Sequence, residues 1–330
     1  MRIIQENTPL KNKNWFQTGG TAKFYTEPTN NIAFQEALAY ADNKKLPIFV
    51  LGKGANILIS DNGFDGLVIK PELCEITHEK LNNNTENNTG NSKNILVQAG
   101  AGVPIENLIH YCLEHNITGL EEFSGIPGTV GGSVYINIHY FKHFLSDFLH
   151  QAQVINKTTG KIKLVDQNWF NFGYDKSKLF EKNYFLTQAT FKLKKATDLE
   201  TAYAKGRSVE ITRHRNARYP NTHTCGSFFR NFLEHEVTQT ISGSDKSGSG
   251  KKMIYVAYYL DKLGIKGQLS YGGAIISHKH ANMIVNTGNA TSQDIINLAR
   301  EMQQLVKKNF GIIPQPECQL IGFDTYPLLR

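Results

Sequence analysis

The sequence predicts an α+β fold. The chain has 330 residues, which is enough for two or three domains. A hydrophobic content of 40% and a charged content of 20% are typical of a soluble globular protein. Short apolar runs bounded by Gly, Asn and Asp alternate with segments of helical periodicity, without an internal repeat. Strands and helices are therefore expected in one mixed architecture.

Helices are predicted where apolar residues recur at helical spacing. The first has Asn30 as its N-cap and an apolar face formed by Ile32, Phe34, Leu38 and Ala41. The second has Pro104 in its first turn, and its periodicity makes Cys112 a core residue rather than a nucleophile. The remaining helical patterns cover 198–216, 254–263 with Gly264 as C-cap, and the segment opened by Thr291-Ser292-Gln293-Asp294.

Strands are predicted where short apolar runs end in turn residues. They cover 48–51, 57–59, 67–69, 95–99, 185–193, 275–277 and 283–286, and 153–156 and 161–165 form a hairpin around Thr158-Thr159-Gly160. Two polar segments interrupt this pattern, the Asn-rich 78–94 and the Gly-, Ser- and Lys-rich 242–252. We interpret both as exposed inserts, because neither can bury a core.

Charge and cysteine content narrow the partners and the compartment. The net charge of +7 favours anionic partners or simply gives a mildly basic surface; no motif that reads bases is present, so nucleic acid is not expected. Cys74, Cys112, Cys225 and Cys318 form no CxxC pair, which argues against a metal site or a disulfide framework and fits a cytoplasmic location. The polar N-terminus and the absence of a long apolar run predict neither a signal peptide nor a membrane span.

Two glycine turns carry the first chemical signal. They are Leu51-Gly52-Lys53-Gly54-Ala55-Asn56 and Gly125-Ile126-Pro127-Gly128-Thr129-Val130-Gly131-Gly132. Each can bring bare backbone N–H groups close to phosphate oxygens, and Lys53 adds positive charge. One such turn can be a plain turn, whereas two indicate a bound diphosphate. The first joins strand to strand, which favours a flavin cradle over a Rossmann site.

The third motif, Cys225-Gly226-Ser227-Phe228-Phe229-Arg230-Asn231, presents a hydroxyl. Ser227 lies in no GxSxG elbow and has no His-Asp pair near it in sequence. An unactivated serine can still protonate a strongly basic carbanion or enolate. The three motifs together therefore predict an enzyme that holds a hydride-donating phosphorylated cofactor beside a proton donor.

The ordered set of motifs resembles the UDP-N-acetylenolpyruvoylglucosamine reductase family. The matching segments are Gly19-Gly20-Thr21-Ala22, 51–56, 63–69, 125–132, Phe172-Gly173-Tyr174, 226–229, Lys266-Gly267 with Gly272-Gly273-Ala274, His280-Ala281-Asn282, 288–291 and Pro316-Glu317. The resemblance implies a two-part FAD-binding region of the vanillyl-alcohol-oxidase (PCMH) type and a smaller α+β substrate-binding domain. We expect FAD-binding parts at 1–70 and 71–205, a substrate domain at 206–311, and a return of 312–330 to the first part.

The resemblance also implies the reaction and the site. NADPH reduces FAD, which passes hydride to the enolpyruvyl group of UDP-N-acetylglucosamine enolpyruvate and gives UDP-N-acetylmuramate, a peptidoglycan precursor. Ser227 and Glu317 are the implied catalytic residues. The implied FAD-binding residues are Gly52, Lys53, Gly54, Ala55, Asn56, Ile57, Gly125, Ile126, Pro127, Thr129, Gly131, Gly132 and Ser133, and the implied substrate-binding residues are Tyr174, Arg218, Asn231 and His280. The short spacing from Tyr174 to Ser227 is similar to the branch that lacks an extra tyrosine loop.

The sequence departs from the family in two places. Asp175 occupies the position of an arginine that steadies the developing enolate. Two unit charges about 4 Å apart interact by roughly 4 kcal/mol at an effective dielectric of 20, so the reversal of charge is severe. Lys176, Lys178 and Arg230 are candidate substitutes. The segment 136–141 replaces a small-residue stretch, and we interpret its His139 as a packed histidine rather than a covalent flavin link.

Three functions remain open from the sequence. The first is the FAD- and NADPH-dependent enolpyruvyl reductase, with a nucleotide sugar as substrate and a monomeric state. The second is a flavin oxidase acting on another sugar or hydroxy acid. The third is a nucleotide-sugar- or flavin-binding protein whose turnover is impaired by Asp175.

Overall fold

The computed structural model describes residues 4–80, 94–233, 236–237 and 254–330 and confirms the α+β fold. The chain forms two compact units, each built from several segments. Unit 1 comprises 1–5, 25–53 and 66–214, and unit 2 comprises 6–24, 54–65 and 215–330. The predicted insert 242–252 lies outside the described residues.

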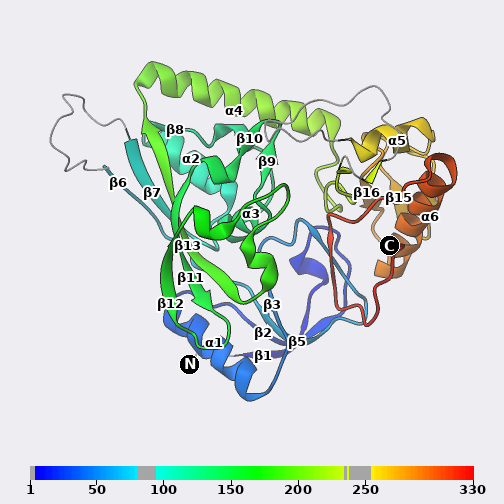
Figure 1. The fold of residues 1–330 in the computed structure, drawn as a ribbon, viewed down its shortest axis with the longest axis horizontal. Coiled ribbons are helices and arrows are strands. Elements are labelled where there is room, and N and C mark those ends of the chain that lie inside the picture. Colours follow the sequence, from blue (N-terminus) through cyan, green and yellow to red (C-terminus); the bar gives the residue numbers. More distant parts are fainter. Residues whose placement is uncertain (1–3, 81–93, 234–235, 238–253) are drawn as a thin grey trace. The chain divides into compact units, whose positions relative to one another are not determined.

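Unit 1 is built on an antiparallel sheet of order β12-β11-β13-β7-β6, with β8 paired to the end of β13 (Figure 1). The pairing Ile155↔Ile162 confirms the predicted hairpin. The predicted loop from His78 is wrong at its start, because His78, Glu79 and Lys80 pair with Val97, Leu96 and Ile95. The strands are β6 (Ile76–Lys80), β7 (Asn94–Gly100), β8 (Ile117–Thr118), β11 (Leu149–Asn156), β12 (Ile162–Asp166) and β13 (Tyr184–Lys195).

Four helices belong wholly or mainly to unit 1: α1 (Asn31–Asn43), α2 (Ile105–Glu114), α3 (Val130–Ile136) and α4 (Asp198–Arg218). The Asn30 side chain accepts from the Ala33 N–H, which confirms the predicted cap. Ile32 is 68% exposed, so its predicted place on the apolar face is wrong; Ala37 lies there instead. Cys112 is buried in the core, and burial raises the pKa of its thiol to about 12.

The first glycine turn lies between two short strands, as predicted. These are β3 (Ile48–Val50), which pairs in parallel with β5 (Phe64–Ile69), and β4 (Ile57–Ile59). A four-stranded sheet has the order β1-β2-β5-β3, where β1 is Gln5–Pro9 and β2 is Thr21–Thr26. The strand-to-strand setting of the turn excludes a Rossmann-type helix start at this point.

Unit 2 packs helices α5 (Val256–Lys262) and α6 (Ser292–Phe310) with a small sheet of β14 (Ser270–Tyr271), β15 (Ala274–Ile276) and β16 (Ile284–Asn286). The side chains of Thr291 and Asp294 form the predicted capping box of α6. The helix predicted from Ile254 begins at Val256. Strand β17 (Gln319–Ile321) pairs in parallel with β4, which brings the C-terminal segment beside the first glycine turn.

The remaining elements are short. They are β9 (His139–Tyr140), β10 (His143–Phe144), and the 3-10 helices η1 (Lys11–Lys13), η2 (Glu121–Phe123), η3 (Leu145–Asp147), η4 (Asn168–Phe170) and η5 (Lys178–Glu181). Among the described residues, every helix is too short or too polar to cross a bilayer.

Candidate functional site

The two glycine turns meet inside unit 1. A Cβ built on Gly52 would lie 2.7 Å from Oγ1 of Thr129, a distance that real side chains essentially never show. Thr129 in turn caps α3, because its Oγ1 accepts from the N–H of Gly132 at 3.3 Å. The bare backbone of the first turn is thus what lets the second turn approach it.

The second glycine turn is held through its own backbone. Gly125 has a φ of +74°, which favours glycine. The N–H groups of Val130 and Gly131 donate to the carbonyls of Val103 and Ala101 at 2.8 and 2.9 Å. These two amides therefore fix the start of α3 and are already occupied by backbone carbonyls. Ile126 and Pro127 are half-buried beside them.

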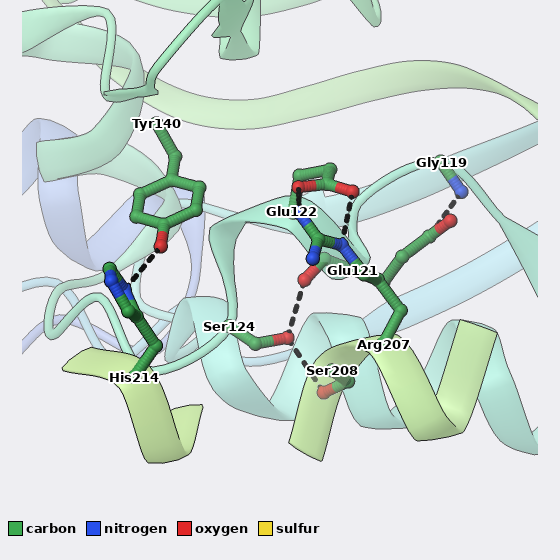
Figure 2. Close-up of polar contacts among 8 residues, drawn as sticks. All are labelled: Gly119, Glu121, Glu122, Ser124, Tyr140, Arg207, Ser208 and His214. Carbon is green, nitrogen blue, oxygen red and sulfur yellow. Dashed lines mark hydrogen bonds and ion pairs between the residues drawn. The ribbon is translucent and has the colours of Figure 1, made fainter. Parts of the chain in front are cut away.

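Helix α4 anchors the segment that leads into this turn (Figure 2). The Arg207 guanidinium donates to both carboxylate oxygens of Glu122 at 2.9 and 3.0 Å. The hydroxyls of Ser124 and Ser208 lie 2.7 Å apart. These contacts fix Glu122 and Ser124 to α4, directly before the glycine turn begins at Gly125.

Two polar atoms in the predicted FAD-binding segments are buried and unsatisfied. Within the described part of the chain, Oγ of Ser133 in unit 1 and Oδ1 of Asn56 in unit 2 have no hydrogen-bond partner. Buried polar atoms normally have one, so each of these atoms is suited to a ligand. Each segment, taken by itself, therefore offers a polar atom to a ligand.

In unit 2 the first glycine turn packs against the N-terminal segment. Gly54 has a φ of +67°, and its carbonyl accepts from the N–H of Trp15 at 3.0 Å. Ala55 and Asn56 follow, and Ile57 starts β4, which pairs with β17. Lys53, the last residue of this stretch of unit 1, is exposed.

The structure brings the segments of Ser227 and Glu317 together within unit 2. The carbonyl of Phe228 accepts from the N–H groups of Glu317 at 2.9 Å and Cys318 at 3.3 Å. Phe229 and Pro316 form an antiparallel bridge. Ser227 is half-buried and follows Gly226, whose φ is +79°. Two residues that are 90 positions apart thus lie on adjoining backbone segments.

Glu317 also contacts the first glycine turn. The Nδ2 of Asn56 donates to Oε1 of Glu317 at 3.5 Å, which is a long hydrogen bond. The Glu317 side chain is partly buried. One end of the predicted FAD site and the predicted acid are therefore neighbours in unit 2.

The predicted substrate-binding residues Arg218 and His280 meet on Tyr219. The His280 ring lies 5.4 Å from the Tyr219 ring, and the Arg218 guanidinium lies 5.9 Å from the same ring. Burial is the largest effect on His280 and lowers its pKa. The charge of Asp261 opposes this shift, and those of Arg218 and Lys266 add to it, so the imidazole is neutral near pH 7. Tyr219 was not predicted, because a lone tyrosine after a basic stretch has no distinctive pattern.

Asn231 is used by the protein itself. Its Oδ1 accepts from the N–H of Val256 at 3.2 Å at the start of α5. Its carbonyl accepts from Arg230 at 3.1 Å. This side chain therefore fixes the junction between the Ser227 segment and α5.

Asp175 is turned toward His139 in unit 1. Its Oδ1 lies 3.4 Å from Nδ1 of His139, and the two side chains are only 11% and 23% exposed. His139 also packs against Phe144 and Tyr174, with ring centroids 5.3 and 4.7 Å away. Burial lowers the pKa of His139 to about 4, so the contact joins a neutral ring to the carboxylate near pH 7. The two departures from the family pattern thus contact each other.

Two of the candidate substitute cations are already engaged. Arg230 makes a two-point contact with Glu236 at 2.6 and 2.8 Å. The Lys178 ammonium lies over the Trp169 ring, 5.2 Å from its centroid. Lys176 is exposed, and its carbonyl accepts from the N–H of Gly173. Lys176 is therefore the candidate whose side chain these contacts do not occupy.

Known proteins match the chain along its whole length. A UDP-N-acetylenolpyruvoylglucosamine reductase of Listeria monocytogenes is 31% identical over 97% of this chain and 96% of its own. UDP-N-acetylenolpyruvoylglucosamine reductase 2 of Bacillus cereus is 30% identical over 97% and 93%. The chain belongs to this reductase family.

Family models and a solved structure agree with that membership. A model of the reductase C-terminal domain matches residues 218–321, and an FAD-binding domain matches 22–166. The crystal structure of UDP-N-acetylenolpyruvylglucosamine reductase from Thermus caldophilus superimposes with a TM-score of 0.72 at 25% identity, covering 97% of this chain and all of that one. The family member described here is thus an FAD-binding oxidoreductase with a PCMH-type domain and a reductase C-terminal domain.

Proposed function

We propose that the chain reduces the enolpyruvyl group of UDP-N-acetylglucosamine enolpyruvate to give UDP-N-acetylmuramate, a precursor of peptidoglycan, with NADPH as the reductant. One observation carries the proposal beyond family membership: the Ser227 and Glu317 segments are hydrogen-bonded neighbours in unit 2. This arrangement supports a shared role for a hydroxyl donor and a carboxyl group in one reaction.

Bound FAD would supply hydride from NADPH to the methylene carbon of the enolpyruvyl group. The Ser227 hydroxyl donates a proton to the adjacent carbon, where negative charge develops. Glu317 stabilises or protonates the enol form of the substrate carboxylate. Gly226 has no side chain, and Phe228 and Phe229 are apolar and buried. The Ser227 hydroxyl is therefore the polar side-chain group at 226–229.

Binding residues follow from the same assignment. We assign FAD binding to the glycine turns with Asn56 and Ser133, and binding of the nucleotide sugar to Tyr174, Arg218, Asn231 and His280. FAD-binding parts at 1–70 and 71–205, a return of 312–330 and a substrate domain at 206–311 complete the assignment. The spacing between Tyr174 and Ser227 supports the branch without the extra tyrosine loop, and we further propose a monomer acting in the cytoplasm.

Because Asp175 stands where the family has an arginine, the proposal needs another positive charge to stabilise the developing enolate. Its carboxylate is largely buried and lies 3.4 Å from Nδ1 of a His139 ring that is neutral near pH 7, so the role of the family arginine falls to another cation. Lys176, next to it and exposed, is the cation that we propose in place of the family arginine.

The test is a substrate-dependent assay on the purified holoenzyme. Flavin absorbance and NADPH oxidation are followed with and without the enolpyruvyl substrate. We expect oxidation that requires the substrate. Hydrogen peroxide formed from a sugar or hydroxy acid would instead support a flavin oxidase. Tight UDP-sugar binding without turnover would support a binding protein that has lost catalysis.

A further inference from the structure

Asn282 forms a three-point contact with the residues that follow Ser227. Its backbone carbonyl accepts from the N–H of Phe228 at 2.8 Å. Its side-chain Oδ1 accepts from the N–H of Phe229 at 3.1 Å, and its Nδ2 donates to the Phe229 carbonyl at 2.7 Å. The side chain is 3% exposed, so these bonds are made away from water.

The same two phenylalanines face the Glu317 segment on their other side. The Phe228 carbonyl accepts from Glu317 and Cys318, and the N–H of Arg230 donates to the Gln315 carbonyl at 3.0 Å. Residues 228–230 are therefore hydrogen-bonded to a partner on each side. One partner is the 315–318 backbone, and the other is a single asparagine.

The chemistry of asparagine explains why this residue type suits the position. A carboxamide carries a donor and an acceptor with nearly the geometry of a peptide group, so it can replace a missing neighbouring strand. Without it, the N–H and C=O of Phe229 would be buried and unpaired, which is strongly unfavourable. A carboxylate or an aliphatic side chain cannot satisfy both groups.

We propose that Asn282 is a positioning residue, which holds the Ser227 hydroxyl in register with Glu317. This inference rests on the proposed function, because it assigns the two residues to one reaction. Asn282 touches neither reacting group. It acts through the backbone of Phe228 and Phe229, and an error of about 1 Å in the placement of a catalytic group can reduce a rate on the order of 100-fold.

Asn286 supplies a matched control in the same unit. It is 2% exposed, and its side chain also makes three hydrogen bonds. Its Nδ2 donates to the Phe16 carbonyl at 2.7 Å, and its Oδ1 accepts from the N–H groups of Gly288 and Ala290 at 2.8 and 2.9 Å. None of these bonds reaches 227–229 or 315–318. Loss of either asparagine thus removes a similar structural contribution, whereas only one loss releases the Ser227 segment.

The experiment compares Asn282→Ala with Asn286→Ala in the FAD-loaded enzyme by stopped flow. For Asn282→Ala we expect flavin reoxidation by the enolpyruvyl substrate to slow on the order of 100-fold. Flavin reduction by NADPH should change less than about threefold, and Asn286→Ala should leave both rates within about threefold of the wild type. Combined with Ser227→Ala, the effect of Asn282→Ala should be far less than additive. Equal effects of the two asparagine variants, or additivity with Ser227→Ala, would overturn the proposal.

A second variant covers the case in which Asn282→Ala does not fold. Asn282→Asp keeps an acceptor for the Phe229 N–H but can donate to the carbonyl only when protonated. Reoxidation by this variant should therefore recover, relative to wild type, as pH falls. A pH profile parallel to that of the wild type would contradict the role.

Hydrogen exchange separates this inference from the proposed function. The backbone amides of 228–230 should exchange faster in Asn282→Ala than in Asn286→Ala, whether or not the substrate is turned over. If the two variants show this difference in exchange while the wild type shows no substrate-dependent NADPH oxidation, the proposed function is wrong and the contact is purely structural. Unchanged exchange in active enzyme would remove the inference alone.

Discussion

The Ser227 and Asp175 regions hold their key side chains in opposite ways. Ser227 lies in a segment fixed through backbone hydrogen bonds to 315–318 and to Asn282, so its hydroxyl is not needed for the fold. The Asp175 carboxylate instead lies inside a cluster of rings, 3.4 Å from Nδ1 of His139, a nitrogen that has no hydrogen-bond partner among the described residues. The Ser227 hydroxyl is therefore available for a reaction, whereas the Asp175 carboxylate is enclosed by the packing of its neighbours.

Ser227→Ala should produce the largest effect. Loss of a general acid typically costs on the order of 100- to 10,000-fold in rate. We expect flavin reoxidation by the substrate to fall by about 1000-fold, while flavin reduction by NADPH stays near the wild-type rate. Stopped-flow absorbance measures both steps. Unchanged turnover would rule out the serine as the proton donor.

Asp175→Arg tests the other side of the comparison. The single change should leave activity equal or higher, because it restores the cation that the family pattern has at this position. The arginine side chain at position 175 must also move out of the partly enclosed site beside His139. The change His139→Ala should make room for it, so the double variant should gain more activity than Asp175→Arg alone. We expect the double variant to exceed the single one by about tenfold in kcat, since 1.4 kcal/mol corresponds to that factor.

A collapse of activity in Asp175→Arg, with thermal stability retained, would mean that the carboxylate has its own role. His139→Ala alone serves as the control for lost packing. If Lys176 is the substitute cation, Lys176→Gln should reduce kcat in the natural background and have less effect beside Asp175→Arg.

Gly52→Ala should weaken FAD binding by about 10- to 100-fold. The new Cβ would lie 2.7 Å from Oγ1 of Thr129 and would push the two glycine turns apart. Gly206→Ala in α4 is the control, because a Cβ there would have no heavy atom within 4 Å and the residue lies outside the predicted FAD-binding segments. Flavin fluorescence titration of the apoprotein measures both affinities. Equal losses would contradict the contact between the turns.

The pH dependence of stability should show the smallest effect. The folded-state pKa of His139, about 4, lies below its ordinary value of 6.5 because of burial. The unfolded chain therefore binds more protons between these values, so the stabilisation is complete above about pH 6.5 and is lost as pH falls toward 4. The Asp175 carboxylate opposes this trend, so the test uses an Asp175→Asn background.

In that background, His139→Phe keeps the ring packing and removes the titration. When the pH is lowered from 7 to 5, the free energy of unfolding of Asp175→Asn should fall by about 1–2 kcal/mol more than that of the double variant Asp175→Asn with His139→Phe. Urea denaturation at both values measures this difference. His110, which is exposed on α2, provides the control through His110→Gln. A loss that increases with rising pH would reverse the assignment of His139 as neutral.

The sequence predicted the local elements well and their contacts poorly. Apolar spacing located α2, and the Asn30 and Thr291 caps were confirmed, because helix starts depend on neighbouring residues. Ile32 was misplaced because its exposure depends on what packs against α1. The start of β6 was missed because polar residues form a strand there only through pairing with β7.

The sequence by itself determined the family and the set of chemistry-bearing residues, because their types and order are recorded along the chain. Tertiary structure alone decided which of them are neighbours. It brought Glu317 beside Phe228 and Asp175 beside His139. It also paired the Asn282 side chain with the backbone N–H and C=O of Phe229. Hydrogen bonds between distant segments depend on the path of the folded backbone, and residue identity does not specify that path locally.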